Sequence, residues 1–109
     1  MKIVKIAAAL KRLKKINDEM RYLSCFEQKQ FSGGLIAFQP SKKADSKQIS
    51  HHDQDVICQI LAGSGRLRID GRRIRLLPGT LCHIPKKTPH DFAASRSGEL
   101  VLFYLLIKN

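Results

Sequence analysis

The stretch from Gly79 to His90, GTLCHIPKKTPH, carries the residue types and spacing with the clearest chemical meaning in this chain. Gly79 precedes a short apolar run, Pro85 marks a turn, and His90 comes just after that turn. An imidazole held in such a place can bind a metal ion or exchange a proton near neutral pH. The stretch therefore predicts a short strand, a proline-bounded turn and one functional histidine.

A second chemically distinctive segment is RLRIDGRRIRL, in which arginines surround an Asp-Gly pair at positions 70 and 71. Asp-Gly favours a two-residue type I′ turn, because both central positions of that turn need positive φ. The resulting hairpin would place four arginines on one face as two cross-strand pairs. The pairs are Arg66 with Arg75 and Arg68 with Arg73. They either bind an anionic ligand or acidic partner, or extend into water while their stems cover apolar surface.

Residues 79–90 resemble the second conserved motif of the cupin superfamily, G(X)5PXG(X)2H(X)3N. Gly79, Pro85 and His90 match this motif, whereas Lys87 and Ala94 replace its second Gly and its Asn. The Asp-Gly hairpin and a Pro-Gly turn add to the resemblance, which covers roughly residues 31 to 107. It implies an all-β, cupin-type jelly-roll barrel that holds a metal or a small molecule in its mouth.

The first cupin motif, which supplies two His and one Glu as metal ligands, is degenerate in this chain. Counting back six residues from Gly63 puts Val56 at the Glu position. The second His of the motif falls on His52 with three intervening residues, or on His51 with four. The resemblance thus implies a divalent metal, Fe, Mn, Ni or Zn, bound by His90 together with His52 and His51.

A third protein ligand decides whether such a site could work as an enzyme. Catalytic metal sites usually combine three protein ligands with one open position. In the segment HHDQD, the third ligand could be His51, Asp53 or Asp55, and a carboxylate would complete a two-His, one-carboxylate set. Alternatively, this polar segment bonds to itself and to water, and no metal is bound.

Neighbouring residues predict the wall of the pocket. Val56 and Cys58 are two residues apart in a short apolar run, so they should share the barrel-facing side of one strand. A buried Cys58 there serves as a small apolar side chain rather than a nucleophile. His83 either lines the pocket or faces solvent, and Asp91 is expected to be exposed on the face opposite to His90.

Composition and charge narrow the class of protein. A chain of 109 residues with 43% hydrophobic and 27% charged residues indicates one soluble globular domain. The net charge of +11 suits an anionic partner, but 6% aromatic residues and no Trp make nucleic acid an unfavoured one. No apolar run is long enough to span a membrane. Three cysteines without a CxxC pair indicate reduced thiols and a cytoplasmic protein.

Two regions are expected along the chain. Residues 1–30 form a helical lead, in which Ile3, Ile6, Leu10 and Leu13 recur at helical spacing. Its amphipathic helix covers part of residues 6–20 and packs on the barrel. Residues 31–109 form the barrel domain, in which Gly33-Gly34 are expected to break the chain before the apolar segment LIAF. Further strands are expected at 56–61, 66–76 (the hairpin), 80–84, near 92 and at 100–107.

The resemblance implies a small-molecule pocket in the barrel mouth. With a bound metal, the resemblance implies oxygenase or isomerase chemistry on a small organic acid or sugar-like substrate, in a homodimer as is common for small cupins. The alternative is a non-catalytic, metal-free module that binds an anionic small ligand or an acidic partner through the arginines. The sequence leaves open whether the protein is an enzyme.

Overall fold

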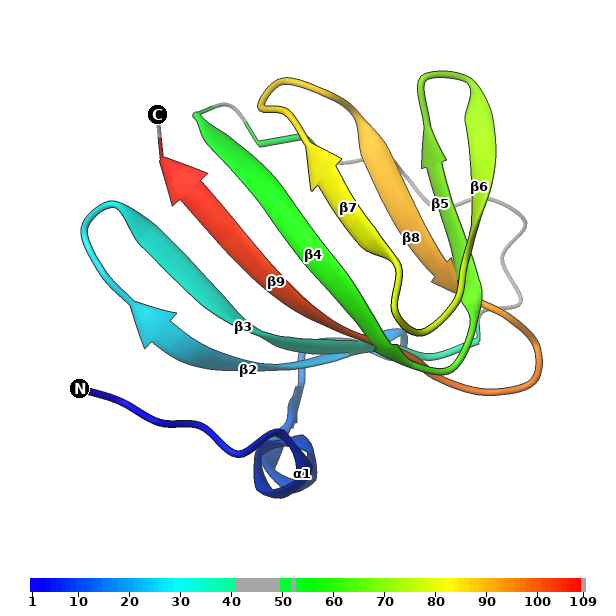
Figure 1. Ribbon diagram of the computed structural model, residues 1–109. Helices are drawn as coiled ribbons and strands as arrows, with labels where there is room; N and C mark the ends of the chain where they lie inside the picture. The colour runs from blue at the N-terminus through cyan, green and yellow to red at the C-terminus, as the bar shows by residue number, and fades with distance from the viewer. Residues whose placement is uncertain (41–49, 52, 109) are drawn as a thin grey trace.

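Antiparallel strands make up most of the chain in the computed structural model, which describes residues 1–40, 50–51 and 53–108 (Figure 1). The larger sheet has the strand order β1-β2-β3-β9-β4-β7. Its strands are β1 (Lys14–Lys15), β2 (Met20–Glu27), β3 (Phe31–Phe38), β9 (Leu100–Lys108), β4 (Gln54–Ala62) and β7 (Leu81–Ile84). The smaller sheet, in the order β6-β5-β8, consists of β6 (Arg72–Leu76), β5 (Gly65–Ile69) and β8 (His90–Ala94). The predicted all-β class is confirmed.

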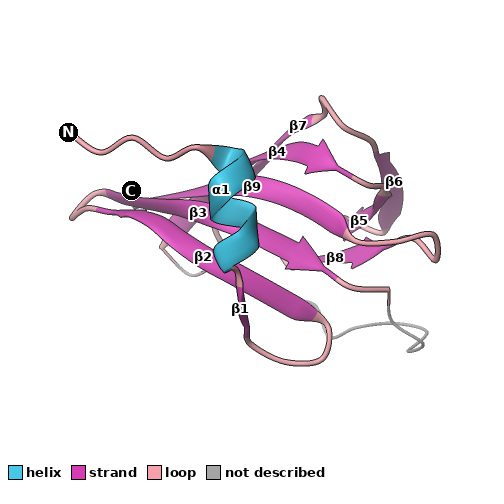
Figure 2. Ribbon diagram, turned by 90° about the horizontal axis from the view of Figure 1, so that it is seen from below, coloured by secondary structure: helices cyan, strands magenta, loops and turns pink. Residues whose placement is uncertain are grey.

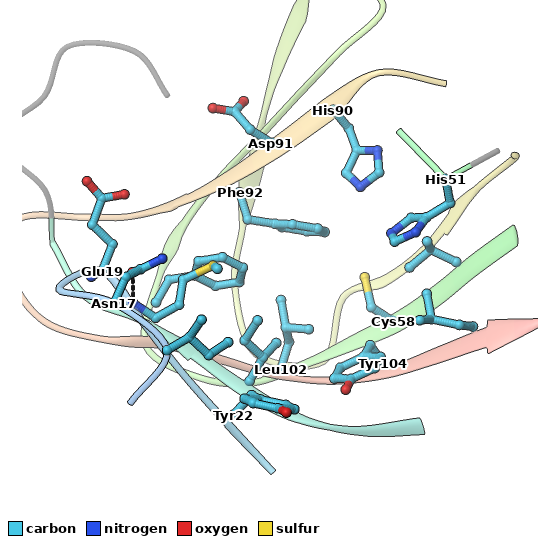
Figure 3. A pocket seen from close by; sticks show the side chains of 16 residues that line it. Asn17, Glu19, Tyr22, His51, Cys58, His90, Asp91, Phe92, Leu102 and Tyr104 are labelled. Atoms are coloured by element: carbon cyan, nitrogen blue, oxygen red, sulfur yellow. Dashed lines mark hydrogen bonds between the residues drawn. The ribbon is translucent and has the colours of Figure 1, made fainter. Parts of the chain in front are cut away.

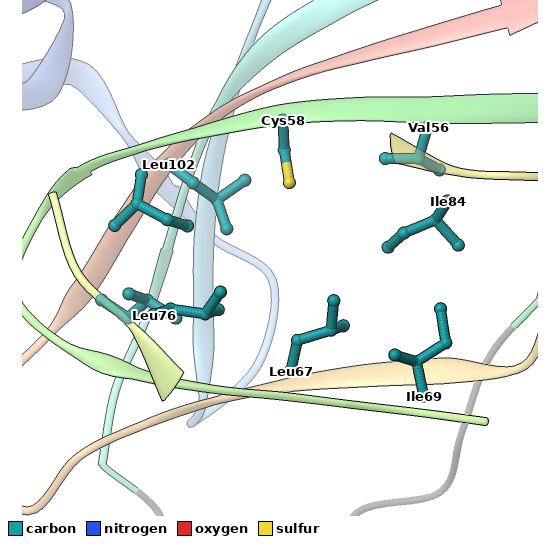
Figure 4. Close-up of a cluster of buried hydrophobic side chains, with 9 residues drawn as sticks. Val56, Cys58, Leu67, Ile69, Leu76, Ile84 and Leu102 are labelled. Carbon is teal, nitrogen blue, oxygen red and sulfur yellow. The ribbon is translucent and has the colours of Figure 1, made fainter. Parts of the chain in front are cut away.

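The inward faces of the two sheets enclose the main hydrophobic core (Figure 4). Its side chains come from alternate positions of the strands, because successive residues of a strand point to opposite faces. Each buried Leu or Ile contributes about 1.5–3 kcal/mol to stability, so this layer holds the sheets together. The buried members are Val56, Cys58, Ile60, Leu67, Ile69, Leu76, Ile84, Leu100 and Leu102.

The predicted N-terminal helix lies against the outer face of the larger sheet (Figure 2). It consists of α1 (Ile6–Ala9) and a following 3₁₀ turn (Leu10–Arg12). Ala9 is buried against Cys25 and Leu35, which belong to β2 and β3. The expected packing of a helix on the barrel is therefore present. No helix in the described ranges has the length and hydrophobicity needed to cross a membrane.

Strand β2 was not expected from the sequence, and with it the larger sheet begins before residue 31. β2 pairs along its length with β3. Tyr22 lies on the face of β2 toward the space between the sheets, whereas Leu23 and Phe26 pack in the cluster beneath the helix. Because apolar side chains lie on both faces of β2, it lacks the polar and apolar alternation by which a half-exposed strand is identified.

Gly33 and Gly34 do not break the chain, contrary to the expectation. Both are buried inside β3. A Cβ atom on Gly34 would lie 2.2 Å from the carbonyl oxygen of Leu23 in the neighbouring strand. Glycine is needed here because two strand backbones approach closely, not because the strand ends.

The hairpin forms with the predicted register. Arg66 is opposite Arg75, and Arg68 is opposite Arg73. The turn between β5 and β6 has Asp70 at φ 51° and Gly71 at φ 72°, so both central residues are in the left-handed region that a type I′ turn requires. The expected strands near residues 56–61, 80–84, 92 and 100–107 correspond to β4, β7, β8 and β9.

Candidate functional site

A cavity of about 470 Å³ lies between the inward faces of the two sheets (Figure 3). This volume suits a small molecule. Much of its wall is apolar and comes from both sheets, including β2 of the larger one: Met20, Ile36, Phe38, Val56, Phe92, Leu102 and Leu106. His51 and His90 lie together at one end, and Asn17 and Glu19 lie at the other.

His90 begins β8 and points into the cavity (Figure 3). The residue is only 2% exposed. Its Nδ1 lies 2.9 Å from the carbonyl oxygen of Thr88, which can only accept, so Nδ1 carries the proton and donates it. In a neutral ring this leaves the Nε2 lone pair of His90 available to accept a hydrogen bond or to bind a metal.

His51 faces His90 across this end of the cavity. Their ring centroids are 6.0 Å apart. The pKa of His51 is lowered from its ordinary value of 6.5, first by burial and then by the nearby His90, while Asp53 opposes the shift. His51 is therefore mostly uncharged at neutral pH in the protein without a ligand.

The turn between β7 and β8 positions both histidines. The backbone N–H of Lys87 donates to the carbonyl oxygen of His51 over 2.7 Å, and Thr88 in the same turn bonds to the ring of His90. Lys87 has φ 65°, a conformation that favours glycine. Lys87 stands where the cupin motif has its second Gly, so the backbone keeps a glycine-type turn although the side chain differs.

Asp55 also hydrogen-bonds to this turn, from outside the cavity. Its Oδ1 accepts the backbone N–H of Lys86 at 3.0 Å, and its Oδ2 is 3.2 Å from Nε2 of His83. In the pairing of β4 with β7, His83 is opposite the half-exposed Ile57, on the outer face of the sheet. His83 does not line the cavity, which corrects its expected role, and Asp55 is directed to the turn rather than to the histidine pair.

Val56 and Cys58 lie on the cavity wall, at the positions where the sequence predicts them. They occupy the inward face of β4, between residues that face outward. The position of the cupin Glu is thus filled by an apolar valine. This end of the cavity presents imidazole nitrogens and hydrocarbon, with no carboxylate at position 56.

The described part of the chain does not by itself supply a metal site. Within it, no three His, Cys, Asp or Glu side chains come close enough together to bind one ion. His51 and His90 provide two imidazoles, one ligand fewer than a catalytic centre usually has. His52 lies outside the described residues. Metal binding by His51, His52 and His90 therefore stays a prediction.

Comparison with known proteins identifies the family. The sequence profile of the AraC-like ligand binding domain matches residues 37–109. The chain belongs to this family. No curated protein matches the sequence of this AraC-like domain.

The solved structures that resemble this AraC-like domain confirm the predicted cupin fold. TT1209 from Thermus thermophilus has a TM-score of 0.79 and 23% identity, covering 99% of this chain and 98% of that one. KdgF from Halomonas sp. has a TM-score of 0.77 and 16% identity, covering 89% and 87%. A cupin-2 domain protein from Shewanella frigidimarina has a TM-score of 0.76 and 15% identity, covering 97% and 95%.

The arginine hairpin of this AraC-like domain has a carboxylate partner in the neighbouring strand β8. Asp91 in β8 is opposite Arg68. Oδ1 of Asp91 is 3.1 Å from Nε of Arg68 and 3.3 Å from Nη1 of Arg66. Asp91 is only 6% exposed, so the expectation that it is exposed was wrong. It lies on the strand face opposite to His90, as expected, and Arg66 and Arg68 cover it there. Binding of an external anion by Arg66, Arg68, Arg73 and Arg75 stays a prediction.

The sequence did not identify several of the residues that line the cavity. Asn17, Glu19, Met20 and Tyr22 come from the segment that was expected to be helical, and Tyr104 comes from the last strand. Tyr22 and Met20 are two residues apart, which is the spacing of one strand face. That spacing was the available signal, but helical periodicity in the preceding residues obscured it.

Proposed function

We propose that this protein binds a small, largely apolar carboxylic acid in the cavity between its sheets, with the acid group beside His51 and His90. The observation that carries this proposal is the meeting of two imidazoles at one end of a cavity with mainly apolar walls. Membership of a ligand-binding family supports it. The sequence offered metal-free binding of an anionic ligand as an alternative, with the arginines as the binding site. We place the acid group at the histidine pair instead.

The charge distribution supports an acid in this orientation. A buried carboxylate needs a hydrogen-bonding or charged partner, because leaving water is costly for an ion. His51 can become that partner by taking up a proton, which a neighbouring carboxylate favours. Glu19 lies at the opposite end of the cavity and would repel an acid group there. The net charge of +11 also favours the approach of anions.

The remainder of the cavity suits the apolar part of the ligand. Phe38 and Phe92 stack with ring centroids 5.6 Å apart, and the ring of Phe92 also contacts His90 edge-on at 5.9 Å. Hydrocarbon that leaves water against such walls gains about 25 cal/mol per Å². We therefore expect chain length and hydrophobicity to raise affinity until the cavity is filled.

Calorimetric titration with octanoate and with its neutral analogue octanamide tests the proposal. We expect octanoate to bind more tightly, and His51→Asn to weaken octanoate binding about tenfold, the loss of one hydrogen bond from the protonated ring to a charged group. His83→Asn is the matched control, because His83 lies on the outer face of the larger sheet. Equal binding of acid and amide, or equal effects of the two substitutions, would contradict the proposal.

The pH dependence of binding provides an independent test. The pKa of free His51 is lowered, mainly by burial, whereas a bound carboxylate would raise it. The complex would then bind more protons than the free protein between these two pKa values. Octanoate affinity should rise as the pH falls through that window, as long as octanoate itself stays ionised, and octanamide affinity should not change. His51→Asn should remove the pH dependence.

Three finer expectations remain proposals. Metal-assisted oxygenase or isomerase chemistry requires His52 or another ligand beside His51 and His90, and elemental analysis of purified protein checks it. A homodimer is checked by light scattering. A cytoplasmic location rests on the sequence alone and is checked by fractionation of the source cells.

A further inference from the structure

Cys58 and Cys82 stand directly opposite each other in the antiparallel pair of β4 and β7. The Cα atoms of directly opposite residues in such a pair are about 4.5 or 5.5 Å apart, depending on the hydrogen-bonding pattern. Both values fall in the range of about 4.4–6.8 Å that a disulfide spans. Both thiols are free.

The two thiols share one face of the sheet. Cys58 alternates with the outward-facing Ile57 and Gln59 and points into the molecule (Figures 3 and 4). Cys82 lies between the exposed Leu81 and His83 and packs against the main core. The side chains therefore face each other across the two strands, at a Cα separation that a disulfide spans.

Cys82 has the properties of the attacking thiol. A hydrogen bond from Cys58 lowers the pKa of Cys82 to about 7, so much of it is thiolate at neutral pH. The same hydrogen bond, followed by burial, raises the pKa of Cys58. Cys82 is half-buried in β7, the edge strand of the larger sheet, whereas Cys58 is fully buried. A reagent can thus reach Cys82 first.

We propose that Cys58 and Cys82 form an oxidisable dithiol, which low-molecular-weight disulfides such as oxidised glutathione convert to a cross-strand disulfide. The Cys82 thiolate attacks one sulfur of the reagent, forms a mixed disulfide and releases one glutathione thiolate. The Cys58 thiol then gives up its proton to water and attacks Sγ of Cys82, which releases the second glutathione thiolate. The protein loses two electrons and two protons, and the reagent becomes two molecules of glutathione.

The position of this pair links oxidation to the cavity. Cys58 lines the cavity wall, so the disulfide would change a group that faces the bound molecule. It would also connect β4, which carries Val56, to β7, which leads into the turn that bonds to both histidines. This inference does not depend on the identity of the ligand.

Cys25 provides an internal control for the reaction. It is buried in the separate cluster beneath the N-terminal helix, on the outer face of the larger sheet. Its Sγ lies 3.7 Å from the carbonyl oxygen of Leu23, and no cysteine is opposite it in the register of β2 with β3. Selective reaction therefore distinguishes the proposed pair from general thiol oxidation.

The test is to incubate the fully reduced native protein with oxidised glutathione, block the remaining thiols under denaturing conditions and map peptides without reduction. We expect a single Cys58–Cys82 linkage with Cys25 alkylated, and Cys25→Ser should give the same linkage. Cys58→Ser should leave Cys82 as a stable mixed disulfide with glutathione. Cys82→Ser should leave Cys58 unmodified. The same reaction in strong denaturant should lose this selectivity.

Three results would overturn the inference. The first is a native protein whose cysteines all remain unreacted. The second is a linkage that includes Cys25. The third is a wild-type protein that accumulates glutathione on Cys82 without proceeding to the Cys58–Cys82 linkage.

Discussion

His90 shows how a residue that is recognisable from sequence takes its chemical state from its surroundings. The spacing from Gly79 through Pro85 predicts an imidazole after a turn. The Thr88 carbonyl fixes the proton on Nδ1, and burial against the cavity wall directs Nε2 inward. His51, which lies far away in sequence, faces it across the end of the cavity, and the turn bonds to the backbone of His51. The proposed ligand-binding unit is thus a pair, whereas the motif specifies one member.

Asp91 carries a prediction at the residue scale. Its carboxylate is buried between Arg66 and Arg68, so Asp91→Asn should remove its ion pairs with these two arginines. We expect the free energy of unfolding to fall by about 2 kcal/mol, the value of lost hydrogen bonds between charged groups. Urea denaturation measures this change.

The control for Asp91 is the exposed ion pair of Lys15 and Asp18, whose atoms are 3.1 Å apart. Exposed pairs contribute little, because water and salt screen them. Asp18→Asn should therefore leave the urea midpoint unchanged. A midpoint that is equally insensitive to Asp91→Asn would show that the arginines gain nothing from Asp91.

At the scale of elements, the turn between β7 and β8 organises the site. Its backbone bonds to the segment of His51, to the ring of His90 and, through Lys86, to Asp55. These bonds come from N–H and C=O groups, so they tolerate a change of side chain. This explains how Lys87 can replace the motif glycine while the turn keeps its shape, at the cost of a positive φ.

Lys87→Gly should stabilise the protein. A non-glycine residue in the left-handed region costs about 1–2 kcal/mol. Glycine removes that strain but loses about 0.5–1 kcal/mol of chain entropy, so we expect a net gain of about 0.5–1 kcal/mol in urea denaturation. Octanoate affinity should stay the same, because the backbone bond to His51 remains.

Lys86→Gly is the matched control for this turn. Lys86 does not have positive φ, so glycine there relieves no strain. We expect it to lower the free energy of unfolding, because only the entropy term remains. If both substitutions lower stability equally, the strain assigned to Lys87 is wrong.

At the scale of the whole molecule, the two sheets and the N-terminal segment form a cavity with His51 and His90 at one end and Asn17 and Glu19 at the other. The larger sheet contributes β2, β3, β4 and β9 to the wall, and the smaller sheet contributes β8. The helix covers the other side of the larger sheet, so it supports the cavity without lining it. The cavity wall thus combines residues from two separate parts of the chain, 16–58 and 90–106.

Removal of metal is the prediction at this scale. The proposed acid site needs only His51 and His90, so treatment with a chelator followed by dialysis should leave octanoate affinity unchanged. Elemental analysis before and after treatment gives the metal content. Affinity that falls on chelation and returns with Fe, Mn, Ni or Zn would show that His51, His52 and His90 act through a metal instead.

The sequence by itself determined the features that depend on local chemistry. These are the Asp-Gly hairpin and its register, the strand and turn that lead to His90, and the inward placement of Val56 and Cys58. Each follows from backbone preferences or from the two-residue period of a strand. Together with the motif, they were sufficient to predict the cupin fold.

Only the tertiary structure decided which distant residues meet. It placed Cys82 opposite Cys58, directed His83 and Asp55 away from the cavity, and buried Asp91 between two arginines. It also turned the segment from Met20 into a strand with apolar side chains on both faces. The physical reason is that strand pairing and burial are set by long-range contacts, which override local periodicity and bring together residues that no sequence spacing connects.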